Sequence, residues 1–106
     1  ESYRKAIEVK PDFANAYFGL GIVLKEEGEV EEVIASYRKA IEVKPDFVDA
    51  YLSLATVLKE EGKAAEAISL LKNAYKIEPS LISSLHFVAG IYSLGEDFAN
   101  FIFRAP

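Results

Sequence analysis

The sequence predicts an all-α fold, a right-handed superhelical α-solenoid of antiparallel helix pairs, from two observations. The first is a repeat: residues 2–13 and 36–47 both read SYRKAIEVKPDF, and residues 23–28 and 57–62 both read VLKEEG, each pair 34 residues apart. Pro11, Pro45 and Pro79 keep the same step. The second is that apolar residues within each unit recur at the spacing of amphipathic helices. Repeats of this length bury their apolar faces by stacking on one another, which predicts the solenoid.

The first complete unit contains two helical segments, which we name helix A and helix B. Residues 14–27 place four packing residues at helical spacing and end at Gly28: Tyr17, Leu20, Gly21 and Leu24. Residues 30–43 place five on one face: Val33, Ile34, Tyr37, Ala40 and Ile41. Pro45 ends this helix, because proline disfavours helical backbone in the residue before it. The connection is short, so the two helices are expected to be antiparallel.

The second unit repeats this scheme over residues 48–61 and 64–77. Its packing positions hold Tyr51, Leu54, Ala55 and Leu58 in helix A, and Ala67, Ile68, Leu71 and Ala74 in helix B. Small residues at packing positions let helices approach closely, which we expect of Gly21, Ala40, Ala55 and Ala74. The residues after the prolines, Asp12, Asp46 and Ser80, are predicted helix N-caps.

The third unit departs from the pattern. Leu85, Val88, Ala89 and Tyr92 fit helix A, but Gly95 comes one residue early, and Phe101 occupies a small-residue position of helix B. We therefore predict one domain over residues 1–106, which divides into a partial repeat (1–13, helix B), two repeats (14–47 and 48–81) and a degenerate or capping repeat (82–106).

Composition excludes several functions. The chain has 12 basic and 17 acidic residues, a net charge of −5, whereas nucleic-acid-binding domains carry a basic surface. No apolar run approaches the roughly 20 residues of a membrane span. Cysteine is absent, which rules out disulfides and thiolate metal sites. The expected partners therefore include no nucleic acid and no membrane.

The repeat resembles the tetratricopeptide-repeat (TPR) family over nearly the whole chain. The family's helix A pattern matches Tyr17, Leu20, Gly21 and Leu24, and its closing proline matches Pro45 and Pro79. Residues 10–28 are most similar to bacterial and O-GlcNAc-transferase-type arrays, in which the repeats present substrates to a separate catalytic domain. The resemblance implies a concave groove lined by helices A.

The resemblance also implies which residues face that groove. The expected peptide-binding residues are Asn15, Phe18, Ile22 and Lys25 in the first unit, Asp49, Leu52, Thr56 and Lys59 in the second, and His86 and Phe87 in the third. The family's carboxylate clamp is absent from the inner positions. The asparagine ladder of the transferase-type arrays is also absent, because Gly19, Ser53 and Phe87 stand in its places. Phe18, Ile22, Leu52 and Phe87 are expected to form one apolar strip suited to an apolar segment of a partner.

No arrangement of residues predicts catalysis, a cofactor or a metal. His86 is the sole histidine, and no second ligand stands at metal-binding spacing from it. The Gly-Leu-Gly of residues 19–21 lies inside a predicted helix, and not after a strand as in a nucleotide-binding loop. We therefore expect a protein that is not an enzyme.

Three functional hypotheses follow. The first is a protein-interaction scaffold that binds a peptide or helix in its groove. The second is a self-associating module, since Phe98, Phe101 and Ile102 are expected to lack a stacking neighbour and exposed apolar faces favour oligomers. Phe98, Phe101 and Phe103 either fold back as a cap or reach into another molecule, and we favour the second. The third is the substrate-presenting arm of a larger enzyme such as a glycosyltransferase.

Overall fold

The computed structural model describes residues 13–96, 100 and 101, and within them it contains helices and no strand. In order, the elements are α2 (Ala14–Glu26), α3 (Val30–Val43), α4 (Val48–Glu60), α5 (Ala64–Ile77), the 3-10 helix η1 (Pro79–Ser83) and α6 (Leu85–Ser93). The prediction of an all-α fold is confirmed. The helix expected in the partial repeat, residues 1–9, lies outside the described residues, as do Asp12, Phe98, Ile102 and Phe103.

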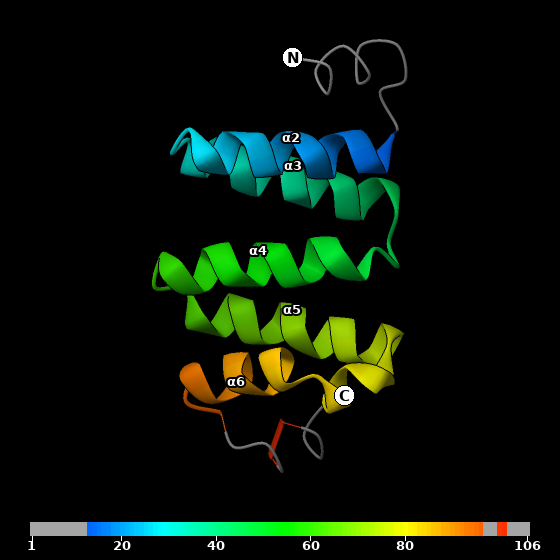
Figure 1. Ribbon diagram of the computed structural model, residues 1–106, viewed down its shortest axis with the longest axis vertical. Helices are drawn as coiled ribbons and strands as arrows, with labels where there is room; N and C mark the ends of the chain where they lie inside the picture. Colours follow the sequence, from blue (N-terminus) through cyan, green and yellow to red (C-terminus); the bar gives the residue numbers. More distant parts are fainter. Residues whose placement is uncertain (1–12, 97–99, 102–106) are drawn as a thin grey trace.

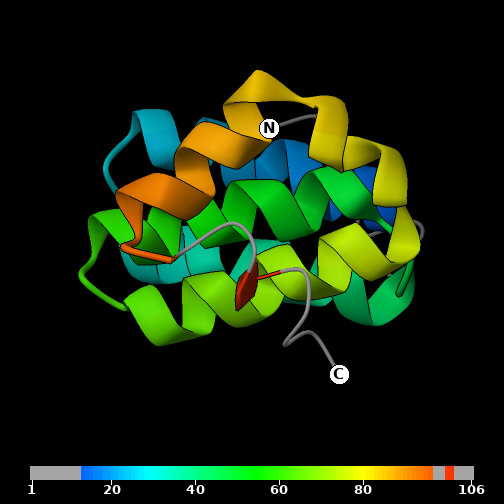
Figure 2. The ribbon, with the colours of Figure 1, turned by 90° about the horizontal axis from the view of Figure 1, so that it is seen from below.

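The helices stack as successive pairs in two layers (Figures 1 and 2). Helix α2 packs on α3 and α4 packs on α5, while α3 and α4 join the two pairs. The A helices α2, α4 and α6 form one layer and run in the same direction. The B helices α3 and α5 form the second layer and run in the opposite direction. On the B layer, Arg38 of α3 and Glu66 of α5 form an ion pair of 2.7 Å between neighbouring repeats.

Each A helix ends in the same way. Gly28, Gly62 and Gly95 all adopt a φ of 79°, a left-handed conformation that glycine reaches without strain. The residue after each glycine donates its backbone N–H to a carbonyl five residues back, at Leu24, Leu58 and Ile91 respectively. This closing pattern reverses the chain toward helix B and satisfies helix-end carbonyls.

The predicted N-caps are wrong where the structure describes them. Helix α4 begins after Phe47 and has no side-chain cap, so Asp46 does not serve as one. Ser80 lies inside η1. The side-chain cap in the third unit is instead Ser84, whose hydroxyl accepts a hydrogen bond of 3.3 Å from the backbone N–H of Phe87. In the second unit, the Tyr51 hydroxyl donates to the carbonyl of Pro45 at 2.9 Å and fixes the preceding loop to α4.

The small residues at packing positions are buried as predicted. Gly21, Ala40, Ala55 and Ala74 all lie in the interior. The closest approach is at Gly21, where a Cβ atom would lie 2.5 Å from Cε1 of Tyr37. The aromatic ring of α3 therefore rests directly on the backbone of α2.

The predicted register of the third helix A is wrong by one residue. Matching Gly95 to Gly62 places Phe87 in the position of Leu54 and Ile91 in that of Leu58, and both are buried. By contrast Leu85 is 83% exposed and Tyr92 is 60% exposed, although both were expected to pack. The cause lies before the helix, where the 3-10 helix η1 takes the place of the first turn of helix A. Ser84 is the N-cap of α6, which begins at Leu85.

Phe101 has a stacking neighbour, so the prediction that it lacks one is wrong. It is only 1% exposed and packs edge-on against Phe87 and Tyr75, with ring centroids 5.9 and 6.3 Å away. The Lys72 ammonium lies 6.0 Å from the centre of the Phe101 ring. This residue folds back onto its own chain as a cap, contrary to the intermolecular contact that the sequence favoured.

Candidate functional site

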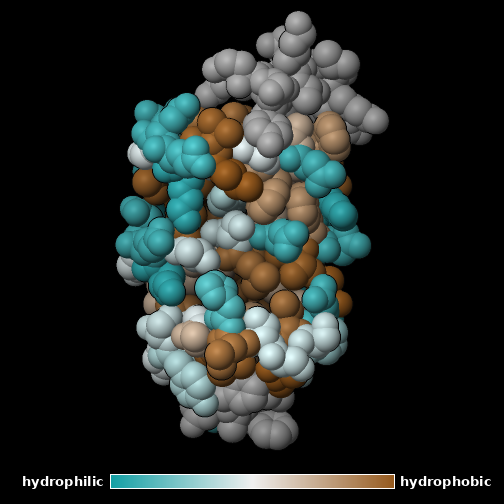
Figure 3. All heavy atoms as spheres, viewed as in Figure 1, coloured by the Kyte–Doolittle hydropathy of each residue, from teal (hydrophilic) through white to brown (hydrophobic). Residues whose placement is uncertain are grey.

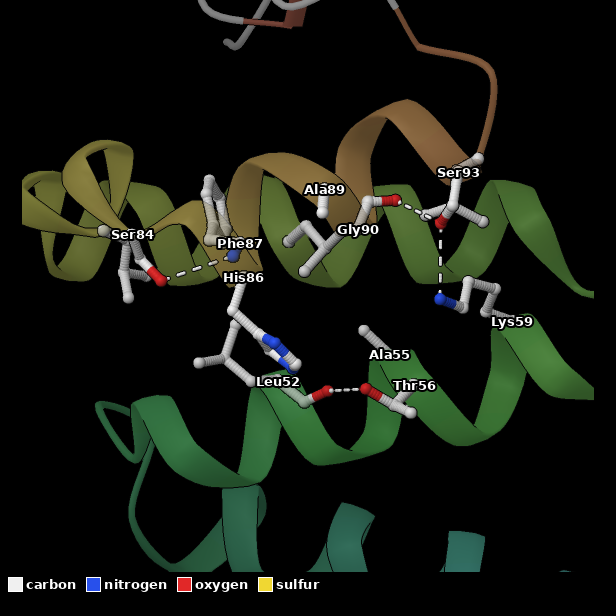
Figure 4. Close-up of a pocket in the computed structure, with 13 residues that line it drawn as sticks. Leu52, Ala55, Thr56, Lys59, Ser84, His86, Phe87, Ala89, Gly90 and Ser93 are labelled. Carbon is white, nitrogen blue, oxygen red and sulfur yellow. Dashed lines mark hydrogen bonds between the residues drawn. The ribbon is translucent and has the colours of Figure 1, made fainter.

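A cavity of about 440 Å³ opens between α4 and α6 (Figure 4). Helix α4 contributes one wall because residues three and four apart along it share a face. Helix α6 contributes the other wall, while Leu71 and Leu81 contribute apolar surface from α5 and η1. The lining residues are Leu52, Ala55, Thr56, Lys59, Leu71, Leu81, Ser84, His86, Phe87, Ala89, Gly90, Ser93 and Leu94.

Lys59 joins the two walls of this cavity. Its ammonium nitrogen, Nζ, donates a hydrogen bond of 3.3 Å to Oγ of Ser93 on α6 (Figure 4). The Ser93 hydroxyl in turn donates to the carbonyl of Gly90 at 2.8 Å, and the Thr56 hydroxyl donates to the carbonyl of Leu52 at 3.0 Å. The Ser93 and Thr56 hydroxyls thus donate their protons to carbonyls of their own helices, whereas the Lys59 ammonium lies at the edge of the cavity.

A second cavity of about 320 Å³ adjoins the first and reaches α2. It is lined by Phe18, Asp49, Leu52, Ser53, Thr56 and His86. Leu52, Thr56 and His86 line both cavities, so the two form one continuous groove along α4. We call this surface the A-helix groove.

Tyr37 of α3 lies behind the second cavity, next to Phe18 and Ser53, which line it. Burial raises the pKa of the Tyr37 hydroxyl above its ordinary value, and an interaction with the Ser53 side chain partly offsets the rise. Its ring also lies near Phe18, with centroids 5.6 Å apart, and Phe18 in turn lies 5.0 Å from the ring of Phe47. These contacts fix Phe18 at the edge of the groove.

The structure brings together seven of the ten predicted groove residues. Those seven line the cavities: Phe18, Asp49, Leu52, Thr56, Lys59, His86 and Phe87. Asn15, Ile22 and Lys25 are exposed on α2 and line neither cavity. The expected apolar strip is therefore shorter than predicted: Ile22 is not part of it, and Phe87 is 5% exposed and belongs mainly to the core.

Several lining residues were not predicted. The sequence placed Ala55 and Leu71 at packing positions and gave Leu81 and Leu94 no role, whereas all four line the larger cavity. Ser84 did carry a signal, since a serine directly before an apolar run is a typical N-cap.

The face that contains α2, α4 and α6 has hydrophobic side chains along its middle and hydrophilic ones at its sides (Figure 3). Within residues 13–96, 100 and 101, no three His, Cys, Asp or Glu side chains are grouped so that they could hold a metal ion. In the same part of the chain, no helix has the length and apolar character needed to cross a membrane.

Comparison with known proteins identifies the repeats. A family model described as TPR repeat matches residues 1–28 and 23–62, and one described as tetratricopeptide repeat matches residues 48–81. A comparison with curated protein sequences finds no match.

Solved structures share this fold. Two crystal structures of MamA match with 32% and 31% identity and TM-scores of 0.71 and 0.67, covering 76% and 78% of this chain. The chain spans less than half of those proteins, 47% and 45% of their length. The Yersinia enterocolitica type III secretion chaperone SycD, in complex with a peptide of the translocator YopD, matches with a TM-score of 0.78. This match covers 88% of this chain and 74% of the chaperone. At 18% identity it shows a shared fold alone.

Proposed function

We propose, since the chain belongs to the tetratricopeptide-repeat family, that it is a protein-interaction scaffold whose A-helix groove binds an apolar peptide segment or helix of a partner. Solenoids of this kind use extended surfaces formed by successive repeats to bind other proteins. The proposal assigns the protein no catalytic step.

One observation carries this proposal: the two adjoining cavities lie on one face and expose apolar side chains from successive repeats. Leu52 stands at their junction. The larger cavity has a volume of about 440 Å³, within the range of roughly 300–1,000 Å³ of ligand pockets. Burial of a ligand's apolar surface there is worth about 25 cal/mol per Å². The SycD complex supports the proposal only in that the shared fold is compatible with a bound peptide.

The test is selection of binding peptides from a displayed library, with Leu52→Asp as the variant that places a charge in the groove. Ile77→Asp is the matched control, because Ile77 is exposed on α5 and lines neither cavity. Selected peptides should bind the wild type and Ile77→Asp equally and lose binding to Leu52→Asp. Peptides that bind all three proteins equally would place the binding surface elsewhere. Circular dichroism establishes that both variants are folded.

A second candidate function is self-association, which the exposure of Leu85 and Tyr92 on α6 favours. Neither side chain lines a cavity, so this surface is distinct from the A-helix groove. Light scattering over a dilution series tests it: a mass that rises with concentration, and falls back to the monomer value in Leu85→Asp, would support self-association. A monomer at all concentrations would contradict it.

The third hypothesis, a substrate-presenting arm of a larger enzyme, rests on the resemblance to transferase-type arrays alone. Sequencing the complete gene would test it, because a catalytic domain in the same chain is its direct consequence.

A further inference from the structure

The A-helix groove carries opposite charges toward its two ends. Asp49 lines the smaller cavity in the first turn of α4, and Lys59 lines the larger cavity in the last turn. A helix rises 1.5 Å per residue, so the ten steps from Asp49 to Lys59 correspond to about 15 Å. Leu52 and Thr56 lie between the two charges and line both cavities.

Neither charge is paired with an opposite charge in the described part of the chain. The ion pairs there are Arg38–Glu66 and Lys39–Glu42, both away from the groove. Lys59 hydrogen-bonds to the neutral Ser93 hydroxyl. A ligand that covers these groups takes them partly out of water, which costs free energy unless the ligand supplies a partner.

From this arrangement we infer that the groove selects an extended segment with an apolar centre, flanked by one basic and one acidic residue. The inference rests on the proposed function and names the chemistry of the partner. The basic residue pairs with Asp49, the acidic residue pairs with Lys59, and the apolar centre fills the cavities beside Leu52. An extended chain advances about 3.3 Å per residue, so charges four residues apart are about 13 Å apart, close to the separation on α4.

The separation of the two charges favours an extended segment over a helix as the occupant, because a short extended segment spans it. Volumes of about 320 and 440 Å³ fall near the lower end of the range for ligand pockets. Each cavity can therefore take side chains from an extended segment that crosses both. In a helical ligand, two charges 15 Å apart would have to be ten positions apart in the sequence.

Helix stability offers another explanation for the same two residues. An acid in the first turn and a base in the last turn both interact favourably with the helix macrodipole. The chain contains the controls that separate the two explanations: Glu31 lies in the first turn of α3 and Lys76 in the last turn of α5, and both are exposed away from the cavities.

The experiment titrates the 106-residue chain with three peptides and follows the groove resonances by NMR. All three have serine and glycine ends and a Leu-Phe-Leu centre, flanked by Lys and Glu, by two Lys, or by two Glu. The mixed-charge peptide should bind about threefold to tenfold more tightly than either other peptide, the size expected of partly exposed charge pairs. This design is insensitive to the direction in which the peptide lies.

Charge reversals then change the preferred peptide. Lys59→Glu should come to prefer the peptide with two lysines, and Asp49→Lys the peptide with two glutamates. Lys76→Glu and Glu31→Lys make the same changes in net charge and should retain the preference for the mixed peptide.

The outcomes separate the inference from the proposed function. If all three peptides bind equally, and Leu52→Asp abolishes binding, the charge selection is wrong and the groove function stands. If Lys76→Glu or Glu31→Lys changes the preference as much as the groove variants do, overall charge and not the groove determines it, which also overturns the inference. If no peptide binds the wild type at millimolar concentration, the proposed function fails and the inference fails with it.

Discussion

Replacing Gly21 with alanine tests how closely α2 and α3 are packed. The added Cβ would lie 2.5 Å from Cε1 and 2.7 Å from Cδ1 of Tyr37, whereas carbon atoms in contact are about 3.5–4.0 Å apart. The Tyr37 ring is buried and has Phe18 beside it, with ring centroids 5.6 Å apart, so it cannot move away freely. Overpacking of this kind costs about 1–3 kcal/mol of unfolding free energy.

Alanine also favours a helix over glycine by about 0.5–1 kcal/mol, which opposes the clash. We therefore expect a net loss of about 1–2 kcal/mol, and a melting temperature lower by roughly 5–15 °C for a domain of this size. Gly90→Ala is the matched control, because no atom beyond the local helix backbone lies within 4 Å of the Cβ that it would add. Gly90→Ala should therefore be stabilised by about 0.5–1 kcal/mol, the preference of a helix for alanine over glycine.

The second repeat supplies a further check. One step of 34 residues later, the same two positions hold Ala55 and Leu71, so an alanine is accommodated where the partner is leucine. The double variant Gly21→Ala, Tyr37→Leu copies that pair and should be more stable than the sum of the single changes by at least about 1 kcal/mol. Urea unfolding measures the stability of the wild type, the two single variants, the double variant and Gly90→Ala. A Gly21→Ala protein as stabilised as Gly90→Ala would refute the reasoning.

Three other changes test separate parts of the structure. Ala40→Leu places a larger side chain at a fully buried position and should cost about 1–3 kcal/mol in urea unfolding; an unchanged midpoint would contradict the packing assignment. Phe101→Ala removes the ring that covers Phe87 and Tyr75 and should cost roughly 3–5 kcal/mol in urea unfolding, whereas a variant as stable as the wild type would show that the cap is dispensable. The hydrogen bond from Arg38 lowers the pKa of Glu66, so this pair stabilises the protein above the ordinary glutamate pKa of 4.5, and the stabilisation is lost as the pH falls through the lowered value. Glu66→Gln should therefore show a shallower loss of stability on acidification than the wild type, and parallel curves would contradict the assignment.

The sequence was sufficient for the two regular repeats because their main local signals agree, the predicted Asp46 N-cap being the exception. The 34-residue step, the helix-ending glycines and the small packing residues all predict the same helices, and α2 to α5 begin at or next to the expected residues. Helical spacing places Leu52, Thr56 and Lys59 on one face of α4, and the resemblance to the TPR family implied that this face lines the groove.

The third unit could not be derived in this way, because its spacing admits two registers. Counting forward from Tyr51 makes Leu85 and Tyr92 packing residues, whereas counting back from Gly95 makes Phe87 and Ile91 the packing residues. The structure has the second register because the Gly95 turn is retained and η1 absorbs the missing residue. The packing of Phe87 against Phe101, a tertiary feature that the spacing does not contain, is consistent with the second register.

The contact of Tyr37 with Gly21 has a consequence for how nearly identical repeats find their correct partners during folding. Residues 23–28 and 57–62 are the same, so these residues do not tell the two complete repeats apart. If α3 took the place of α5 against α4, the Tyr37 ring would meet the Cβ of Ala55. If α5 took the place of α3 against α2, Leu71 would leave empty space over Gly21. Of these two B helices, α3 therefore fits α2 best and α5 fits α4 best, which disfavours exchange of partners between the two complete repeats.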